Sequence, residues 1–458
     1  VGQAQHRETH GYERDSVREV HTLKQFFSKG HVGGHIRHYS MATINYEDLK
    51  DWHTTGVSGL LEYRTGLFHG FQFGISGLFI YNLYSSDFTE TDPITGQGSR
   101  YELQLFDVNH PENKHDLDRL DELFLKYSFG HGSFIRYGKQ GIYSPLMNTQ
   151  DTRMKPYMVG GFWAEIDEVE NLTINAGWFD RASVRSTTEW VSLSESMGIY
   201  SQGYTPEGEE SEYHEELNTG WVGVVGLTWK AREDLSLQGW NYLIDNVSNT
   251  TFLQADYQPE IGTDQWLVLG GQLLYQTAIN EGGNPEAIHR YMQPGQQNTL
   301  FALRTGLKTE NWSFSLNYLQ AGKGGRFTFP REWGREQFYT TVSRGRIEGM
   351  GGVKTLMSTF RCNMGGRFRI RVDAGRTIAP DLNNFELNKH QQITYNHFNF
   401  DLRYKFTGVL EGLNLRFLYV HKQSVEDYSE QPERLYYKAN FNHFNLISAA
   451  QLGNTDLL

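Results

Sequence analysis

The sequence predicts an all-β fold, an 18-stranded antiparallel transmembrane β-barrel. Segments of alternating apolar and polar residues recur from residue 34 to residue 452, joined by connections that are long and short in turn. In the run 71–81 (FQFGISGLFIY), Phe71, Ile75 and Phe79 fall on one face and Gln72 and Ser76 on the other. Alternation over about ten residues suits a strand with lipid on one side and water on the other. Strands of soluble sheets are shorter, usually about five or six residues.

Composition agrees with this class. The chain of 458 residues holds 10 Trp, 26 Tyr, 28 Phe and 48 Gly, and its mean hydropathy is −0.57. Such a composition fits aromatic girdles around a polar lumen, and no run approaches the roughly 18 apolar residues of a membrane helix. The net charge of −12 argues against a nucleic-acid partner. The single cysteine, Cys362, excludes an internal disulfide.

Eighteen segments carry the alternating pattern. They span 34–45, 55–65, 70–82, 118–130, 132–140, 156–166, 171–180, 219–230, 234–244, 249–258, 265–277, 299–309, 311–320, 353–363, 366–375, 395–407, 412–422 and 442–452. Long links such as 83–117 and 321–352 alternate with short ones such as Gly130-His131, and only 46–54 and 245–248 are short members of the long set. Outer-membrane barrels have this alternation, with long extracellular loops and short periplasmic turns.

The prediction divides the chain into a periplasmic N-terminal segment (1–33), the barrel (34–452) and a C-terminal tail (453–458). An even number of strands leaves both termini in the periplasm. The first fifteen residues (VGQAQHRETHGYERD) lack the apolar centre of a signal peptide, so we expect a signal peptide to have been removed before Val1. The expected location is the bacterial outer membrane, in contact with lipid and lipopolysaccharide.

Strand parity predicts a column of inward cations. In 366–375 (GRFRIRVDAG), Phe368 and Ile370 face lipid, so Arg369 and Arg371 face the lumen. A slip of one residue would place arginines in hydrocarbon, at roughly 2–4 kcal/mol each. The predicted ladder comprises Arg304, Arg361, Arg367, Arg369, Arg371, Arg403, Lys405 and Arg416. Such a column would guide a carboxylate from site to site. Alternatively, these cations pair with Asp373 and Asp401 and only solvate the lumen.

Three stretches resemble the OprD-type family of substrate-specific outer-membrane channels: GHVGGHIRHYSMATIN (30–45), RYGKQGIYSPLMNTQDTRMKPYMVGGFW (136–163) and FPREWGREQFYTTVSRGRIEGMGG (329–352). The resemblance implies eighteen-stranded monomers with a basic ladder and loops that fold inward to form a constriction. It implies in-folding of the loops Ile142–Pro156 and Ala321–Gly352. By the same resemblance, the constriction residues are Asp151, Arg153, Arg331, Glu332, Arg335 and Glu336.

The first of these loops also has local features that favour in-folding. It joins two neighbouring strands, and it is much longer than closure requires. Pro145 and Pro156 stiffen its ends, and Met147 and Met154 are suitable apolar anchors against an inner wall.

The predicted function is passive, substrate-selective diffusion of small carboxylate-bearing solutes such as amino acids, short peptides or organic acids. One alternative is a porin for neutral sugars such as chito-oligosaccharides, which would need a track of inward aromatics. Another is a structural barrel subunit of a larger outer-membrane complex. An enzyme is not expected, because the sequence lacks a GxSxG elbow or a convincing carboxylate pair.

No cofactor or metal is expected. His31, His35 and His38 lie close together, but no cysteine or carboxylate completes a ligand set. The acidic stretch 115–122 (HDLDRLDE) has oxygen ligands that calcium could use, but it lacks the glycine turn of a dedicated loop. We expect it to be a solvated entry to a strand.

Overall fold

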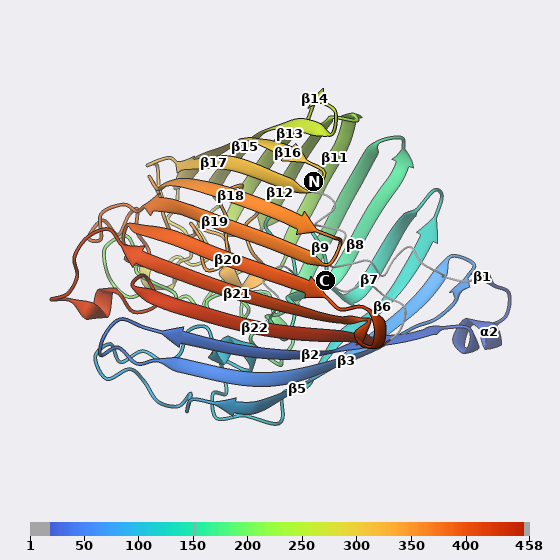
Figure 1. Ribbon diagram of the computed structural model, residues 1–458, viewed down its shortest axis with the longest axis horizontal. Coiled ribbons are helices and arrows are strands. Elements are labelled where there is room, and N and C mark those ends of the chain that lie inside the picture. The colour runs from blue at the N-terminus through green and yellow to red at the C-terminus, as the bar shows by residue number, and fades with distance from the viewer. Residues whose placement is uncertain (1–18, 150–152, 453–458) are drawn as a thin grey trace.

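The computed structural model describes residues 19–149 and 153–452. Within these residues, eighteen long strands form one antiparallel barrel, which confirms the predicted fold class (Figure 1). The barrel closes where the last strand pairs with the first, with Leu452 opposite Gly34. The strands are β2 (His31–Ile44), β3 (Trp52–Arg64), β5 (Phe71–Ser85), β6 (Arg119–Phe129), β7 (Ser133–Gln140), β8 (Met158–Val169), β9 (Leu172–Ser183), β11 (Val222–Arg232), β12 (Leu235–Ile244), β13 (Ser248–Tyr257), β15 (Gln265–Ala278), β16 (Gln297–Thr309), β17 (Trp312–Ala321), β18 (Lys354–Met364), β19 (Phe368–Ile378), β20 (Tyr395–Lys405), β21 (Leu413–Ser424) and β22 (Phe441–Leu452).

The predicted strand parity is confirmed where it was most explicit. On β5, Phe79 and Tyr81 are 55% and 52% exposed on the outer face, whereas Leu78 and Ile80, which alternate with them, are 1% and 2% exposed. Arg367 departs from the prediction, because it lies in the turn 365–367 and β19 begins only at Phe368. The turn takes this form because two consecutive glycines, Gly365 and Gly366, adopt left-handed φ angles of 56° and 68°.

Long and short connections alternate as predicted, and they lie at opposite ends of the barrel (Figure 1). At the end with the short turns, β1 (Glu19–Val20) pairs with β4 (Leu67–Phe68) in the first turn. Helix α2 (Leu23–Ser28) packs Phe26 against the same turn. Two further short strands, β10 (Val191–Ser192) and β14 (Glu260–Gly262), extend neighbouring strands. No helix in the described part of the chain is long and apolar enough to span a membrane.

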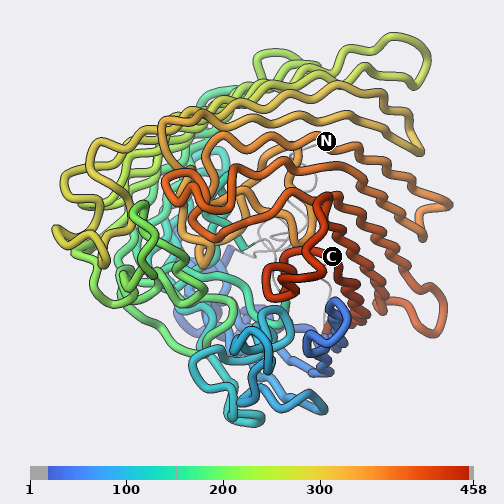
Figure 2. Tube along the Cα trace, turned by 90° about the vertical axis from the view of Figure 1, so that its left-hand side faces the viewer, coloured from blue at the N-terminus to red at the C-terminus, as the bar shows by residue number. Residues whose placement is uncertain are grey.

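The half of the barrel near the long loops has an apolar inner wall. Val222, Val224, Leu274 and Leu300 are fully or almost fully buried there, in a core shared with residues of the long loops. A second core joins Leu418 and other wall residues to the loops 86–118 and 425–440. Figure 2 shows these loop segments lying within the ring of strands. The loops therefore occupy much of this half of the lumen.

Paired substitutions on β18 test which face meets lipid. Phe360 is an outward residue near the middle of the strand, between Phe314 and Val372 of the neighbouring strands. We expect Phe360→Arg to lower the free energy of unfolding in lipid vesicles by roughly 2–4 kcal/mol, because it places a charge in hydrocarbon. Arg361→Ala, at the adjacent inward position, should change the free energy of unfolding by only about 0.5 kcal/mol. Urea titration followed by tryptophan fluorescence measures both, and equal effects would contradict the assignment of faces.

Candidate functional site

Two long loops meet inside the barrel, and we call 141–157 and 322–353 the constriction loops. Their meeting point is Asn148, which is fully buried. Its side chain donates to the carbonyl oxygens of Ser144 and Arg335, both at 3.0 Å, and accepts from the Arg335 N–H at 3.2 Å. The Asn148 N–H donates to the carbonyl of Trp333 at 3.1 Å. Backbone bonds of this kind fix one loop directly on the other and confirm the predicted in-folding.

The anchors of the first constriction loop are those that the sequence indicated. Met147 and Met154 are 0% and 1% exposed, each within one of the two apolar cores. Leu146 is also buried, and its N–H donates to the hydroxyl of Tyr242 on the barrel wall at 3.2 Å. Tyr242 and Trp240 are inward aromatics of the wall, and both are buried in the apolar core that packs against this loop.

A cavity of about 600 Å³ lies among the loops near their meeting point. Three of the predicted constriction residues, Arg153, Arg331 and Arg335, line it. The described residues of its wall include nine cationic side chains and two carboxylates, Glu210 and Glu348. The cationic residues are Arg100, Arg153, Arg185, Arg331, Arg335, Arg344, Arg346, Lys422 and Lys438. An imbalance of this size makes the cavity attractive to anions.

The other predicted constriction residues lie elsewhere. Glu332 is 4% exposed and accepts from the Tyr200 N–H at 3.0 Å, and burial raises its pKa. Glu336 is 6% exposed, accepts from the Ile347 N–H at 3.1 Å and lies 3.6 Å from Arg346. These two acids thus hold loop backbone and a neighbouring arginine. Asp151 lies outside the described residues.

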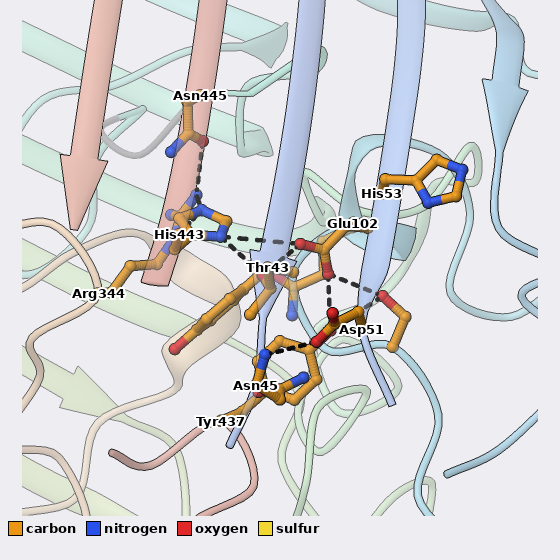
Figure 3. Close-up of polar contacts among 12 residues, drawn as sticks. Thr43, Asn45, Asp51, His53, Glu102, Arg344, Tyr437, His443 and Asn445 are labelled. Atoms are coloured by element: carbon orange, nitrogen blue, oxygen red, sulfur yellow. Dashed lines mark hydrogen bonds and ion pairs between the residues drawn. The ribbon is translucent and has the colours of Figure 1, made fainter. Parts of the chain in front are cut away.

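Arg344 is held in the cavity wall by a buried polar chain from the barrel (Figure 3). Its Nε donates to Nε2 of His443 on β22 at 3.1 Å. Because Nε2 accepts from a cation, the ring proton lies on Nδ1, which donates to the hydroxyl of Thr43 at 2.7 Å. That hydroxyl donates to Glu102, which also accepts from Tyr437 at 2.7 Å. Strands β2 and β22 and three loops are joined in this way, so the arginine has a fixed position.

Six of the eight predicted ladder residues lie on four neighbouring strands, β18 to β21. The register sets Arg361 opposite Arg371, Arg369 opposite Arg403, and Arg403 opposite Arg416. Arg304 stands apart on β16, 3.9 Å above the ring of Tyr339 from a constriction loop. Lys405 closes β20 near the turns and is exposed. The structure thus brings together five of the eight predicted residues in adjacent cross-strand positions.

Both interpretations of the ladder find support in its ion pairs. Arg371 lies 2.9 Å from Asp373, while Arg403 and Arg416 lie 3.4 and 2.7 Å from Asp401. Arg361 differs, because its Nε is buried without a hydrogen-bond partner among the described residues. Part of the ladder is therefore neutralised by acids of the same wall, whereas Arg361 forms no ion pair with a described residue.

Several cavity cations escaped the prediction from sequence. Lys422 has the same inward parity as Arg416 on β21, so strand alternation alone would have found it. The other missed cations come from loops, where no periodicity indicates the direction of a side chain: Arg100, Arg185, Arg344, Arg346 and Lys438.

The acidic stretch 115–122 differs in part from the prediction. His115, Asp116 and Asp118 are exposed, as a solvated strand entry requires, but Asp121 is 1% exposed and pairs with buried Arg119 at 2.5 Å. Within the described chain, no group of three or more His, Cys, Asp or Glu side chains could hold a metal ion.

A closed antiparallel barrel with in-folded loops and a charged lumen defines a channel-forming protein of the outer-membrane type. A sequence model described as "outer membrane porin, OprD family" matches residues 104–345, which is more than half of the chain. The chain therefore belongs to the OprD family of outer membrane porins. No curated protein matches it.

Solved structures share the fold over nearly the whole chain. Pseudomonas aeruginosa OccK8 (OprE) matches with a TM-score of 0.71 and 16% identity, covering 93% of this chain and 99% of that one. P. aeruginosa OpdK, solved with vanillate, has a TM-score of 0.69 and 14% identity, with coverage of 93% and 99%. Acinetobacter baumannii OccAB1 has a TM-score of 0.68 and 12% identity, with coverage of 94% and 98%. At this identity the likeness shows the fold alone.

Proposed function

We propose that this porin passes small carboxylate-bearing solutes, such as amino acids, short peptides or organic acids, by passive diffusion into the periplasm. The observation that carries the proposal is the cavity wall, with nine cationic side chains against two carboxylates in the described chain. The cavity lies on the loop side of the ladder, since Lys422 is near the loop end of β21 and Arg416 nearer the turn end. An anion entering from the loops meets first the cavity and then the ladder.

The cations compensate for part of the hydration that a carboxylate loses on entering a narrow passage. A carboxylate leaves its hydration water behind, and charge-assisted hydrogen bonds from guanidinium groups replace part of that hydration. The bonds are strongest where the local dielectric constant is low. Because Asp373 and Asp401 neutralise part of the ladder, no single site holds an anion with the full charge of the column. Moderate binding at successive sites permits release as well as entry.

The same proposal includes the position in the membrane. The outward belt, with residues such as Leu125, Leu227, Leu273 and Phe314, all more than a third exposed, would contact outer-membrane lipid and lipopolysaccharide. The end with the short turns, and with it both termini, would face the periplasm. The segment before β2 and the residues after Leu452 would then be periplasmic appendages.

Arg361→Ala tests the ladder. We expect the variant to conduct carboxylates more slowly and to bind them about ten- to a hundredfold more weakly, because one charge-assisted contact is lost. The matched control is Arg376→Ala, which removes the same charge from an outward position on the adjacent strand β19. Reversal potentials and solute block in planar bilayers measure both.

Two results would contradict these expectations. If Arg361→Ala and wild type conduct every carboxylate alike, the ladder serves only to solvate the wall. A wild-type channel that prefers cations and is blocked only by neutral sugars would contradict the proposed substrate class and favour an oligosaccharide porin.

A further inference from the structure

The cavity contains a lysine with no counter-charge. Lys422 is 2% exposed, and its Nζ lies 4.2 Å from the centre of the Tyr395 ring. It lines the cavity, yet its ammonium group makes no hydrogen bond or ion pair with any described residue. A buried ammonium group is unfavourable without a partner, since an aromatic face replaces only part of its hydration. The side chain therefore lacks an anionic partner in the direction of the cavity.

A second cation of the cavity, Arg100, also lacks a counter-charge. Arg100 is half-buried, its guanidinium carbon lies 5.8 Å from the centre of the Tyr101 ring, and it has no ion-pair partner in the described chain. Burial lowers its pKa, and the positive charges of Arg331 and Arg346 lower it further. Lys438 is affected similarly, because burial and the charges of Arg100 and Arg434 lower its pKa to about 8. Like charges are thus gathered at this wall, where they repel one another.

The neighbouring cations are already fixed by protein contacts. Arg331 lies 3.6 Å from Glu348, and Arg344 is bonded to His443 and Asn445 (Figure 3). Arg344 and Arg100 also contact the same Tyr101 ring, at 4.8 and 5.8 Å. Among the cavity cations of the described chain, only the side chains of Lys422 and Arg100 have neither a hydrogen bond nor an ion pair with the protein, which leaves these two for a ligand. One negative charge would leave one of them uncompensated, whereas two would satisfy both.

We propose that this cavity is a binding site for a small organic dianion, which carries two carboxylates or one phosphate monoester group. The proposal rests on the proposed function and narrows its substrate class. A dianion would be held on Lys422 and Arg100 before it moves to the ladder, and a monocarboxylate would pass with weaker retention. Arg331 and Arg344 would add hydrogen-bond donors around the same ligand.

The test compares matched solutes in single-channel recordings at fixed ionic strength. Succinate supplies two carboxylates, glycerol 3-phosphate supplies one phosphate monoester, and butyrate is a monocarboxylate of similar size. In the wild-type channel, we expect both dianions to block at concentrations about tenfold lower than butyrate. Lys422→Met, which keeps the stem and removes the charge, should weaken block by the dianions about tenfold and leave block by butyrate nearly unchanged.

The control is Lys354→Met, the same chemical change at an exposed outward position on β18, which should alter neither solute class. Arg100→Gln gives a second, independent loss of dianion block should Lys422→Met fail to assemble. Block by succinate but not by glycerol 3-phosphate would support the site and restrict it to dicarboxylates. Equal block by succinate and butyrate in the wild-type channel would overturn the inference. It would also be overturned if Lys422→Met weakened block by succinate and by butyrate to the same extent. Carboxylate flux that depends on Arg361 would still support the proposed function in that case.

Discussion

Glu348→Gln is expected to loosen the second constriction loop and its neighbour, the loop 379–394. Glu348 is 6% exposed and is surrounded by three basic groups. Its carboxylate lies 3.2 Å from His390, 3.6 Å from Arg331 and 3.9 Å from Lys389. Breaking a buried ion pair by removal of one partner typically destabilises by about 3–5 kcal/mol, because the remaining charge is left uncompensated. Lys389 is only 2% exposed, so it would be such a charge.

The effect should be local, because the strands do not depend on this carboxylate. Hydrogen exchange of the loop 379–394 should accelerate strongly, and single-channel currents should become noisier as the cavity wall moves. The matched control is Glu386→Gln, an exposed carboxylate in the same loop. Protection factors that match those of wild type would show that the cluster is not what fixes these loops.

The pH dependence follows from the same cluster. Burial alone would raise the pKa of Glu348, but Lys389, His390 and Arg331 lower it to about 2. A carboxyl with a lowered folded-state pKa contributes stability that is complete above its unfolded pKa and is lost as pH falls towards the folded value. Its contribution to loop order should therefore persist at pH 5 and fade between roughly pH 4.5 and pH 2. The Gln variant should lack this acid transition.

Lys389 should give the loop a second dependence on pH. Burial, with the charges of Arg326 and Arg331, lowers its pKa to about 8, and the charge of Glu348, more than that of Glu332, opposes a larger shift. In Glu348→Gln the pKa of Lys389 should fall further, so the lysine becomes neutral at a lower pH than in wild type. Loop order in the variant should then recover as pH rises, because the uncompensated charge disappears. Hydrogen exchange measured from pH 6 to pH 9 would show this recovery.

Strand parity predicted which wall residues face the lumen, because apolar side chains must face lipid along each membrane-spanning strand and their neighbours then face inward. On β19 and β20, Phe368, Val372 and Phe400 had to face lipid, which fixed the inward direction of Arg369 and Arg403. The rule also covers Lys422. Parity also directs Leu78 and Val222 inward near the loops, but it does not explain why these inward residues are apolar. Their partners are in-folded loops, and the alternation of a strand carries no information about what fills the lumen.

The loop contacts could not be predicted for a different reason. Arg344 meets His443 across 99 positions of sequence, and Asn148 meets Arg335 across 187. Nothing in the local sequence relates such pairs, since each depends on the path of a loop with no repeating geometry. The resemblance to a family indicated which loops fold inward. It did not indicate that Glu332 and Glu336 would be buried as supports while Arg344 and Arg346 reach the cavity.

Shortening the first constriction loop should change the channel more than any single substitution. Replacing residues 146–154 by a short Gly-Ser link would remove Leu146 and Met147 from the apolar core and would abolish the Asn148 bonds to the second constriction loop. Arg153 would also leave the cavity wall. Because Leu146, Met147 and Asn148 are buried within the lumen, we expect single-channel conductance to rise severalfold and discrimination among solutes to fall in the same variant.

The two readouts must change together if this loop forms the constriction. The barrel itself should remain intact, since β7 and β8 pair through backbone bonds from Phe134 to Gln140 that do not involve the deleted residues. The shift of gel mobility on heating, a property of closed barrels, checks this point. Deleting the exposed residues 429–431 in the loop 425–440 is the control, because they lie outside the apolar cores and the cavity wall. Wild-type conductance in the 146–154 variant, with the barrel intact, would place the constriction elsewhere along the lumen.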